Sequence, residues 1–171
     1  LVSGLFGFLI FNWNPSKIFM GDTGSQLLGA LLAGVGIVFF WNNENIIESH
    51  GWFSKLAIVL CAFVVPIGDS ITVTINRLKR GQSPFVGGRD HTTHHLSYAG
   101  LTDRQVAYVM GSLLLISVLL IGGLHLVDDE FLTIYIVVIF IYAISAIAFL
   151  YSTTIWEKPR AVFKARQAAK K

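Results

Sequence analysis

The chain has 171 residues, of which 54% are hydrophobic and 13% charged, and its formal net charge at pH 7 is +3. Soluble domains carry about 25% charged residues, so this composition excludes an ordinary soluble enzyme and predicts an integral membrane protein. The basic residues gather in a few loops and in the C-terminal tail. That placement indicates attraction to anionic lipid headgroups, and it argues against a nucleic-acid partner.

Hydrophobic runs set the expected elements, because a helix needs about 20 apolar residues to cross a bilayer. The first run is too short, and we expect it to be the end of a truncated helix in the C-terminal part of a longer protein. In chain order, the runs are 1–11, 27–41 with the polar lead-in 21–26, 52–75, and 106–155, which Asp128-Asp129-Glu130 divides in two. The sequence therefore predicts an all-α, polytopic membrane helix bundle with about four full spans plus a truncated one. Residues 1–156 form its transmembrane domain, and 157–171 form a basic tail.

The distribution of basic residues predicts the orientation. With these spans, Lys55 is the only one of the 13 Lys and Arg residues on its side of the membrane. The positive-inside rule then places the first loop, the histidine-rich loop near residue 90 and the tail in the cytoplasm.

A polar signature, Asn14-Pro-Ser-Lys17-Ile-Phe-Met-Gly21-Asp22-Thr-Gly-Ser25, precedes the span 27–41. Its glycines permit a positive φ, and its Asp, Thr and Ser side chains favour capping of the helix that follows. A carboxylate at the membrane edge is also a hard-oxygen ligand suited to Mg²⁺. Spacing alone leaves both interpretations of Asp22 open, a helix cap and a metal ligand.

Within the run 52–75, the segment Pro66-Ile67-Gly68-Asp69 predicts a kink. A carboxylate costs about 2.5–3.5 kcal/mol at the centre of a spanning helix, so Asp69 is expected to face other helices or a cavity. It either bonds a neighbouring helix or lies near a functional site. Arg77 follows eight residues later on about the same helical face.

Three of the five histidines lie within five positions, in the sequence Gly88-Arg89-Asp90-His91-Thr-Thr-His94-His95-Leu. In a helix they would share one face and could hold Zn²⁺. The Glu of a His-Glu-x-x-His zinc site is absent from this motif. The surrounding basic residues instead favour an anion site, and a diphosphate fits it best. These basic residues are Arg77, Lys79, Arg80 and Arg89. A solvated polar loop is the simpler alternative.

These motifs resemble those of the polyprenyl-phosphate N-acetylhexosamine-1-phosphate transferases. The resemblance rests on Asn14–Ser25, with its core Phe-Met-Gly-Asp-Thr-Gly-Ser, on the run 77–85, on Asp90-His91-x-x-His94-His95-Leu96, and on Gly100–Gln105. It implies an all-helical bundle in the bacterial cytoplasmic membrane. It also implies transfer of a sugar-1-phosphate from a UDP-sugar to a polyprenyl phosphate, with release of UMP and a requirement for Mg²⁺ (or Mn²⁺). The resemblance leaves the oligomeric state undecided, and a homodimer is one alternative.

Carried over onto this chain, the resemblance implies that Asp22 is the metal-binding and catalytic carboxylate. It implies that His91, His94 and His95 contact the nucleotide diphosphate and sugar. Further substrate-binding positions are Lys17, Gly21, Ser25, Asp69, Arg89 and Asp90.

The resemblance also implies an Asp-Asp pair in an earlier cytoplasmic loop. Here the only adjacent Asp pair is Asp128-Asp129, which the predicted orientation places on the opposite side of the membrane, so the chain departs from the family pattern. We therefore expect the 171 residues to be inactive alone. The histidines precede Leu96-Ser97-Tyr98, which resembles the branch that uses UDP-GlcNAc or a related sugar to begin cell-wall or surface polysaccharides such as lipopolysaccharide. The phospho-MurNAc-pentapeptide transferase branch, a transporter segment and a membrane zinc hydrolase are the alternatives.

Overall fold

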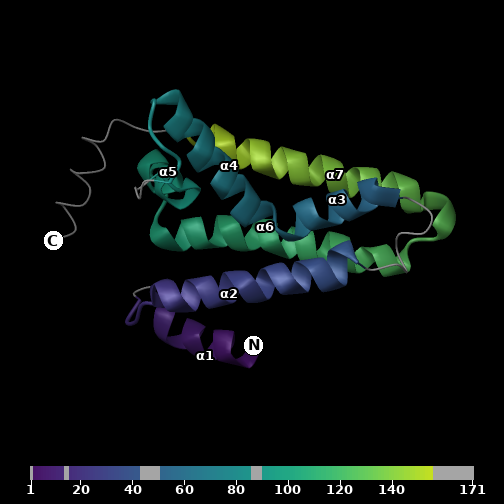
Figure 1. Cartoon of the computed structure of the whole chain (residues 1–171), viewed down its shortest axis with the longest axis horizontal. Helices are drawn as coiled ribbons and strands as arrows, with labels where there is room; N and C mark the ends of the chain where they lie inside the picture. Colours follow the sequence, from purple (N-terminus) through teal and green to yellow (C-terminus); the bar gives the residue numbers. More distant parts are fainter. Residues whose placement is uncertain (1, 14–15, 43–50, 86–89, 156–171) are drawn as a thin grey trace. The chain divides into compact units, whose positions relative to one another are not determined.

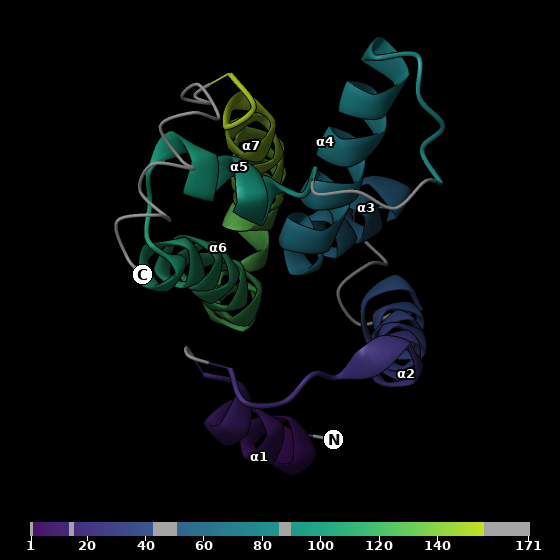
Figure 2. The same cartoon turned by 90° about the vertical axis from the view of Figure 1, so that its left-hand side faces the viewer.

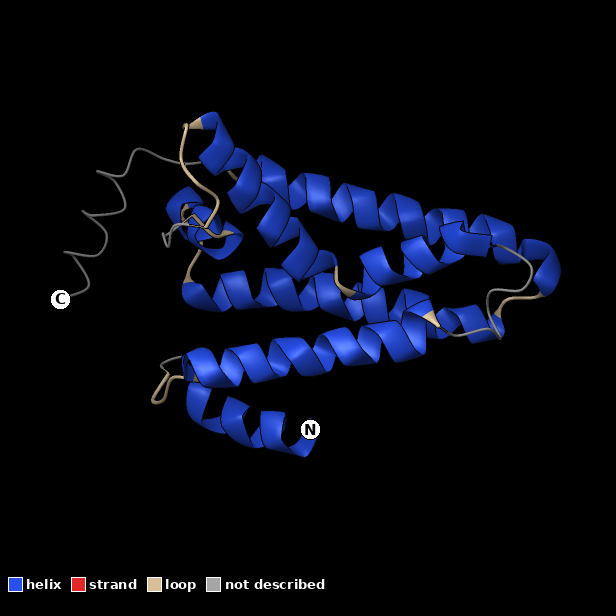
Figure 3. Ribbon diagram, in the orientation of Figure 1, coloured by secondary structure: helices blue, strands red, loops and turns tan. Residues whose placement is uncertain are grey.

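The computed structural model describes residues 2–13, 16–42, 51–85 and 90–155. The chain divides into two compact units, residues 1–44 and 45–171. Helices are the only regular elements in the described ranges, as Figure 3 shows in blue. The predicted all-α class is thus confirmed, and the predicted tail 157–171 lies outside the described residues.

The first unit consists of two consecutive helices. The short α1 covers Val2–Asn12, and α2 covers Gly21–Val35 and continues through the π-helical turn η1, Gly36–Trp41 (Figure 1). Together α2 and η1 make a continuous apolar stretch of 21 residues, long enough to cross a membrane. The predicted span 27–41 therefore begins earlier, because the polar lead-in 21–26 is already helical.

The second unit contains the remaining helices: α3 (Gly51–Ala62), α4 (Val64–Lys79), α5 (Thr92–Ala99), α6 (Asp103–Gly123) with the 3₁₀ turn η2 (Leu124–Leu126), and α7 (Asp129–Ser152). The long α7 packs along both α3 and α4, and α6 packs against the same two helices. The short α5 contacts α4 and α6. Figure 2 looks at this unit from the end where α5 lies, in front of the long helices.

The long helices have the dimensions and surface of membrane spans. At a rise of about 1.5 Å per residue, α6 is about 32 Å long, close to the thickness of a bilayer core. Large apolar side chains cover the outer surfaces of α6 and α7; Val118 and Ile134, for example, are 66% and 64% exposed. A soluble protein does not expose so much contiguous apolar surface, so the chain is a polytopic membrane protein, as its composition predicts. Among the described residues, three helices qualify as spans, or four if α3 and α4 together form one.

The predicted kink in the second full span is instead a break. Helices α3 and α4 meet at Phe63 with a bend of 83°, three residues before Pro66. Proline has no N–H to give to the carbonyl four residues earlier, here that of Ala62, and its ring crowds that carbonyl. The first helix therefore ends at Ala62, and Pro66 occupies the first turn of α4, where the missing N–H costs nothing.

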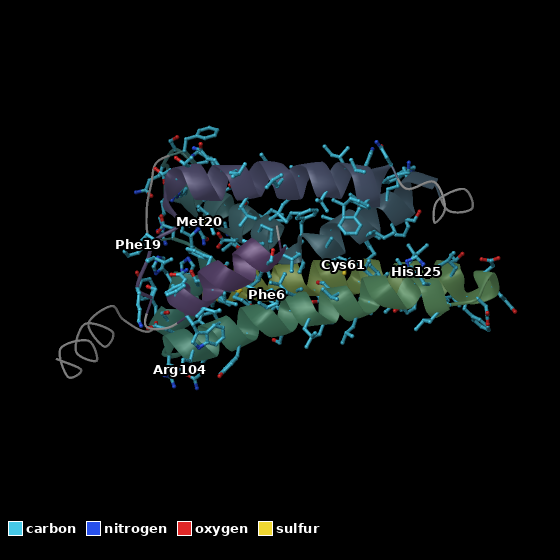
Figure 4. All side chains as sticks on the ribbon, turned by 90° about the horizontal axis from the view of Figure 1, so that it is seen from below. Phe6, Phe19, Met20, Cys61, Arg104 and His125 are labelled. Atoms are coloured by element: carbon cyan, nitrogen blue, oxygen red, sulfur yellow. The ribbon has the colours of Figure 1, made fainter. Side chains whose placement is uncertain are left out.

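The centre of the second unit holds a few polar groups on facing helices. The Tyr142 hydroxyl of α7 donates to the Leu113 carbonyl of α6 over 2.6 Å, and the Ser117 hydroxyl donates to the same carbonyl. The buried Cys61 thiol approaches the Ser117 carbonyl at 4.0 Å. Figure 4 shows Cys61 between Arg104, in the first turn of α6, and His125, just beyond the last turn of α6.

Candidate functional site: the histidine segment

The segment Asp90–Gly100, the histidine segment, is tied to α4 by Asp69. One Asp69 oxygen, Oδ2, lies 2.7 Å from Nδ1 of His91. The other, Oδ1, accepts the backbone N–H of Thr92 at 2.7 Å and its hydroxyl at 2.8 Å. Thr92 is the first residue of α5, so Asp69 satisfies an N–H at that helix terminus from outside the helix. The first alternative left open for Asp69 is therefore confirmed, because it bonds a neighbouring helix, the one that carries His94 and His95. Its place near a functional site stays a prediction.

Asp90 forms a second attachment to α4. Its carboxylate accepts Arg77 Nε at 3.4 Å and Arg80 Nη1 at 3.2 Å, forming two ion pairs. Arg77 is buried, and its Nη1 also donates to the Pro84 carbonyl over 2.7 Å. The guanidinium thus bonds both the middle of the connection, at Pro84, and the start of the histidine segment, at Asp90. Arg77 and Arg80 form part of the local scaffold, although the sequence suggested a basic cluster around a bound anion.

Lys79, the third cation of that cluster, is engaged at the end of α7. Its ammonium donates to the Tyr151 hydroxyl and lies 5.2 Å from the centre of the Tyr151 ring. This contact joins the last turn of α4 to the last turn of α7. Arg89, predicted to bind substrate, lies outside the described residues.

The three histidines occupy three different environments. His91 is the N-cap residue of α5 with extended backbone angles, so the expectation that all three share a helical face is wrong. The cause is tertiary, because the bonds from Asp69 to His91 and Thr92 hold the chain extended just before the helix. The His91 side chain is 51% exposed. His94, one turn into α5, is partly exposed, and its ring centre lies 6.4 Å from that of His91.

His95 faces the interior of the unit. It is 1% exposed, and its Nε2 lies 3.1 Å from the Asp90 carbonyl oxygen, to which it donates. The next residue, Leu96, is equally buried and joins an apolar cluster with Val106, Met110 and Leu150 from α6 and α7. These contacts anchor α5, so His91 and His94 are the two histidines at the surface.

The end of the histidine segment is defined by helix caps. Gly100 has φ +111°, a left-handed conformation that ends α5 and favours glycine. Two residues later, the Thr102 hydroxyl accepts the Gln105 N–H, and the Gln105 side chain accepts the Thr102 N–H, which is a complete capping box. The motif Gly100–Gln105 thus comprises the turn between α5 and α6 and the first residues of α6.

The residues predicted in the first unit lie around the start of α2. Gly21 has φ +69°, and Met20 is the N-cap, with no side-chain cap bond. The helix begins one residue before Asp22, so Asp22, Thr23 and Ser25 lie inside it and do not cap it. The Asp22 side chain is exposed in the first turn, and the Ser25 hydroxyl donates to the Asp22 carbonyl at 3.0 Å. Lys17 is exposed, and its backbone N–H bonds Phe11.

A shallow pocket lies just before α2. It is open to solvent and lined by Asn12, Ser16, Phe19 and Met20. Figure 4 labels Phe19 and Met20, and Phe19 is almost fully exposed. None of the predicted site residues lines this pocket.

The structure thus gathers Asp69, Asp90 and the histidines in the second unit, and Lys17, Gly21, Asp22 and Ser25 in the first. Sequence reasoning missed Thr92, the partner of Asp69, and Tyr98, whose ring stacks beside that of His94 at 6.3 Å. The usual N-cap signal does not point to Thr92, because Thr92 is the first residue of α5 and the N-cap is His91. Within the described ranges, no three His, Cys, Asp or Glu side chains converge on one metal position.

The fold and this segment define a helical membrane protein that presents an anchored, histidine-rich segment at one end of its bundle. The family model described as glycosyl transferase family 4 matches residues 1–40. Relatives of known description extend the likeness over more of the chain, and the chain belongs to this family.

Three relatives illustrate the similarity. The decaprenyl-phosphate N-acetylglucosaminephosphotransferase of Mycobacterium leprae is 30% identical over 64% of this chain and 29% of its own length. The undecaprenyl-phosphate alpha-N-acetylglucosaminyl 1-phosphate transferase of Pasteurella multocida is 34% identical over 52% and 23%. The phospho-N-acetylmuramoyl-pentapeptide-transferase of Carboxydothermus hydrogenoformans is 32% identical over 71% and 34%. The chain spans about a quarter to two-fifths of the length of the curated relatives it matches. No solved structure matches it.

Proposed function

We propose that the full-length protein transfers a sugar-1-phosphate, GlcNAc-1-phosphate in the first instance, from a UDP-sugar to a polyprenyl phosphate in a bacterial cytoplasmic membrane. In this reaction, an oxygen of the lipid phosphate attacks the β-phosphorus, the bond to the α-phosphate breaks, and UMP leaves. The product is the first lipid-linked intermediate of a cell-wall or surface polysaccharide. The names of the three relatives, all polyprenyl-phosphate or muramoyl-peptide phosphotransferases, support this class of reaction.

The single observation that carries the proposal is the anchored histidine segment. His91 and His94 lie at the surface of a short helix that is fixed by Asp69, by the Asp90 ion pairs and by the buried Leu96. Phosphoryl transfer needs positioned donors and charge neutralisation more than it needs covalent chemistry. Imidazole groups on a rigid support meet that need, and we assign them to the diphosphate of the nucleotide sugar.

We assign the cation to the first unit. Asp22 offers an exposed carboxylate, and the neighbouring Thr23 and Ser25 add hydroxyl oxygens. These hard oxygen donors fit Mg²⁺, which uses one or two carboxylates and completes its shell with water and substrate phosphate. When bound, the ion would supply positive charge for phosphoryl transfer. Asp22 would hold it, and Gly21 supports that position because its φ of +69° would strain any other residue.

The proposal is tested with the full-length protein in membranes, supplied with UDP-GlcNAc, undecaprenyl phosphate and Mg²⁺. We expect UMP to be released only when both substrates and the cation are present. Asp22→Asn should reduce the rate by at least about a hundredfold, because a neutral amide does not replace the charge on a metal ligand. Asp129→Asn, the same change in the first turn of α7, is the matched control and should leave the rate unchanged. UMP release that survives Asp22→Asn and chelation of the cation would contradict the assignment.

The second candidate is the muramoyl-pentapeptide branch, favoured by the relative from Carboxydothermus hydrogenoformans. It is tested in the same assay with UDP-MurNAc-pentapeptide in place of UDP-GlcNAc. We expect UDP-GlcNAc to be the preferred donor. A higher kcat/KM with the pentapeptide donor would reassign the chain to that branch.

A further inference from the structure

Asp69 uses its two carboxylate oxygens for two different tasks. Oδ1 accepts the N–H and hydroxyl of Thr92, whereas Oδ2 is bonded to Nδ1 of His91. Support for the start of α5 needs only the first oxygen. The second fixes the imidazole ring of a residue that is half exposed and is itself the N-cap of α5.

The chemistry of this contact determines which ring nitrogen carries the proton. An ionised carboxylate has only acceptors, so Nδ1 of His91 must be the donor. The opposite ring nitrogen, Nε2, is then the atom that remains for a ligand. In His95 the relation is different, because its Nε2 bonds the Asp90 carbonyl and the side chain is buried.

We propose that Asp69 is a positioning residue, which holds the Nδ1 proton of His91 so that Nε2 is presented to the diphosphate of the nucleotide sugar. This inference rests on the proposed function. An imidazolium formed there with a second proton from the bulk solvent would lie between the Asp69 carboxylate and an anionic phosphoryl oxygen, to which Nε2–H would donate. Asp69 thus acts through His91 and does not touch the substrate, although the sequence assigned it a substrate-binding role.

The decisive variant is Asp69→Asn, because asparagine separates the two tasks. Its carbonyl oxygen can still accept from Thr92, which keeps the start of α5. Its amide nitrogen is a donor, so Nδ1 of His91 has to accept and the ring proton moves to Nε2. Thr92→Val is the complementary variant, since it removes a bond to Asp69 at the helix start but leaves the bond to His91. Asp128→Asn, the same chemical change at the N-cap residue of α7, is the control.

Two measurements are made on the full-length protein in lipid nanodiscs. Nitrogen-15 NMR of histidine-labelled protein reports which ring nitrogen is protonated, and His91→Gln identifies the His91 signals by their loss. Steady-state kinetics with UDP-GlcNAc give kcat/KM. In Asp69→Asn, we expect the His91 proton to move from Nδ1 to Nε2. We also expect kcat/KM to fall by about 10–100-fold, as when partners that orient histidine ligands are replaced. Thr92→Val should lower Tm but keep the wild-type tautomer, and Asp128→Asn should match wild type in both measurements.

Three results would overturn the inference. In the first, Asp69→Asn keeps Nδ1 of His91 protonated. In the second, it changes the tautomer but leaves kcat/KM at the wild-type value. In the third, Thr92→Val lowers kcat/KM as much as Asp69→Asn does, which assigns Asp69 a structural role only. A wild-type protein without transferase activity would instead contradict the proposed function, and the NMR result would still decide the Asp69–His91 arrangement.

Discussion

Replacing Asp90 with alanine should loosen the histidine segment. Asp90 is the shared partner of Arg77 and Arg80, at 3.4 and 3.2 Å, and its side chain is only 17% exposed. Asp90→Ala leaves the buried Arg77 guanidinium, 7% exposed, without this counter-charge. Truncating one member of a buried ion pair costs about 3–5 kcal/mol, mainly because the other charge stays buried.

The structure places the expected loss near the lower end of that range. Arg77 keeps its hydrogen bond to the Pro84 carbonyl, and Asp90 is not fully buried. We therefore expect Asp90→Ala to destabilise the protein by about 3 kcal/mol. Arg80 is 42% exposed, so its pair with Asp90 is screened by solvent, and Arg80→Ala should cost at most about 1 kcal/mol.

Thermal unfolding of the full-length protein in detergent measures these differences. On the scale of about 2–4 °C per kcal/mol for a domain of 150–250 residues, this loss corresponds to about 6–12 °C, so in the longer full-length protein Asp90→Ala should lower Tm by at most that amount. Arg80→Ala should lower it by no more than about 4 °C on the same scale. Equal losses for the two variants, or an Asp90→Ala protein as stable as wild type, would refute the view that the buried Arg77–Asp90 pair holds the segment.

Two glycines where helices approach closely give further predictions. A Cβ on Gly68 would lie 2.6 Å from Leu150 Cδ1 of α7, so Gly68→Val should lower Tm clearly. Gly111 has open space around it, so the control Gly111→Val should change Tm little in the same experiment. Equal effects would show that α4 and α7 do not pack closely there. A Cβ on Gly123 would collide with the Tyr135 hydroxyl, so Gly123→Ala should be destabilising. Adding Tyr135→Phe should recover part of the loss in a double-mutant cycle, and independent, additive effects would contradict the predicted contact.

Much of the fold could be predicted from hydropathy. The runs 52–75 and 106–155 are apolar enough to be assigned as helices without tertiary information. The exact position of the break in the second span could not be predicted, because Pro66 only requires that the Ala62 carbonyl receive no helical hydrogen bond from position 66. A kink at the proline and a helix end four residues before it both satisfy that requirement. The structure has the second arrangement, in which α3 and α4 pack separately against α6 and α7.

The histidine segment shows where sequence reasoning reaches its limit. Spacing made the three histidines equivalent, and the family resemblance made Asp90 a candidate for substrate binding. Their observed environments depend on Asp69 and Arg77, which come 22 and 13 positions before their partners in the segment. The turn of the chain that brings α4 beside α5 is a tertiary property. The residue types could be recognised in advance, but their pairing could not.

The bond that is broken in the sugar donor defines the reaction, and a donor labelled at one phosphate identifies that bond directly. UDP-GlcNAc with a radioactive β-phosphate is supplied, with Mg²⁺ and undecaprenyl phosphate, to membranes that contain the full-length protein. If GlcNAc-1-phosphate is transferred, the label moves into the lipid fraction and unlabelled UMP is released. If the label stays in water-soluble UDP while the sugar reaches the lipid, the protein transfers the sugar alone, and its assignment as a sugar-1-phosphate transferase is wrong.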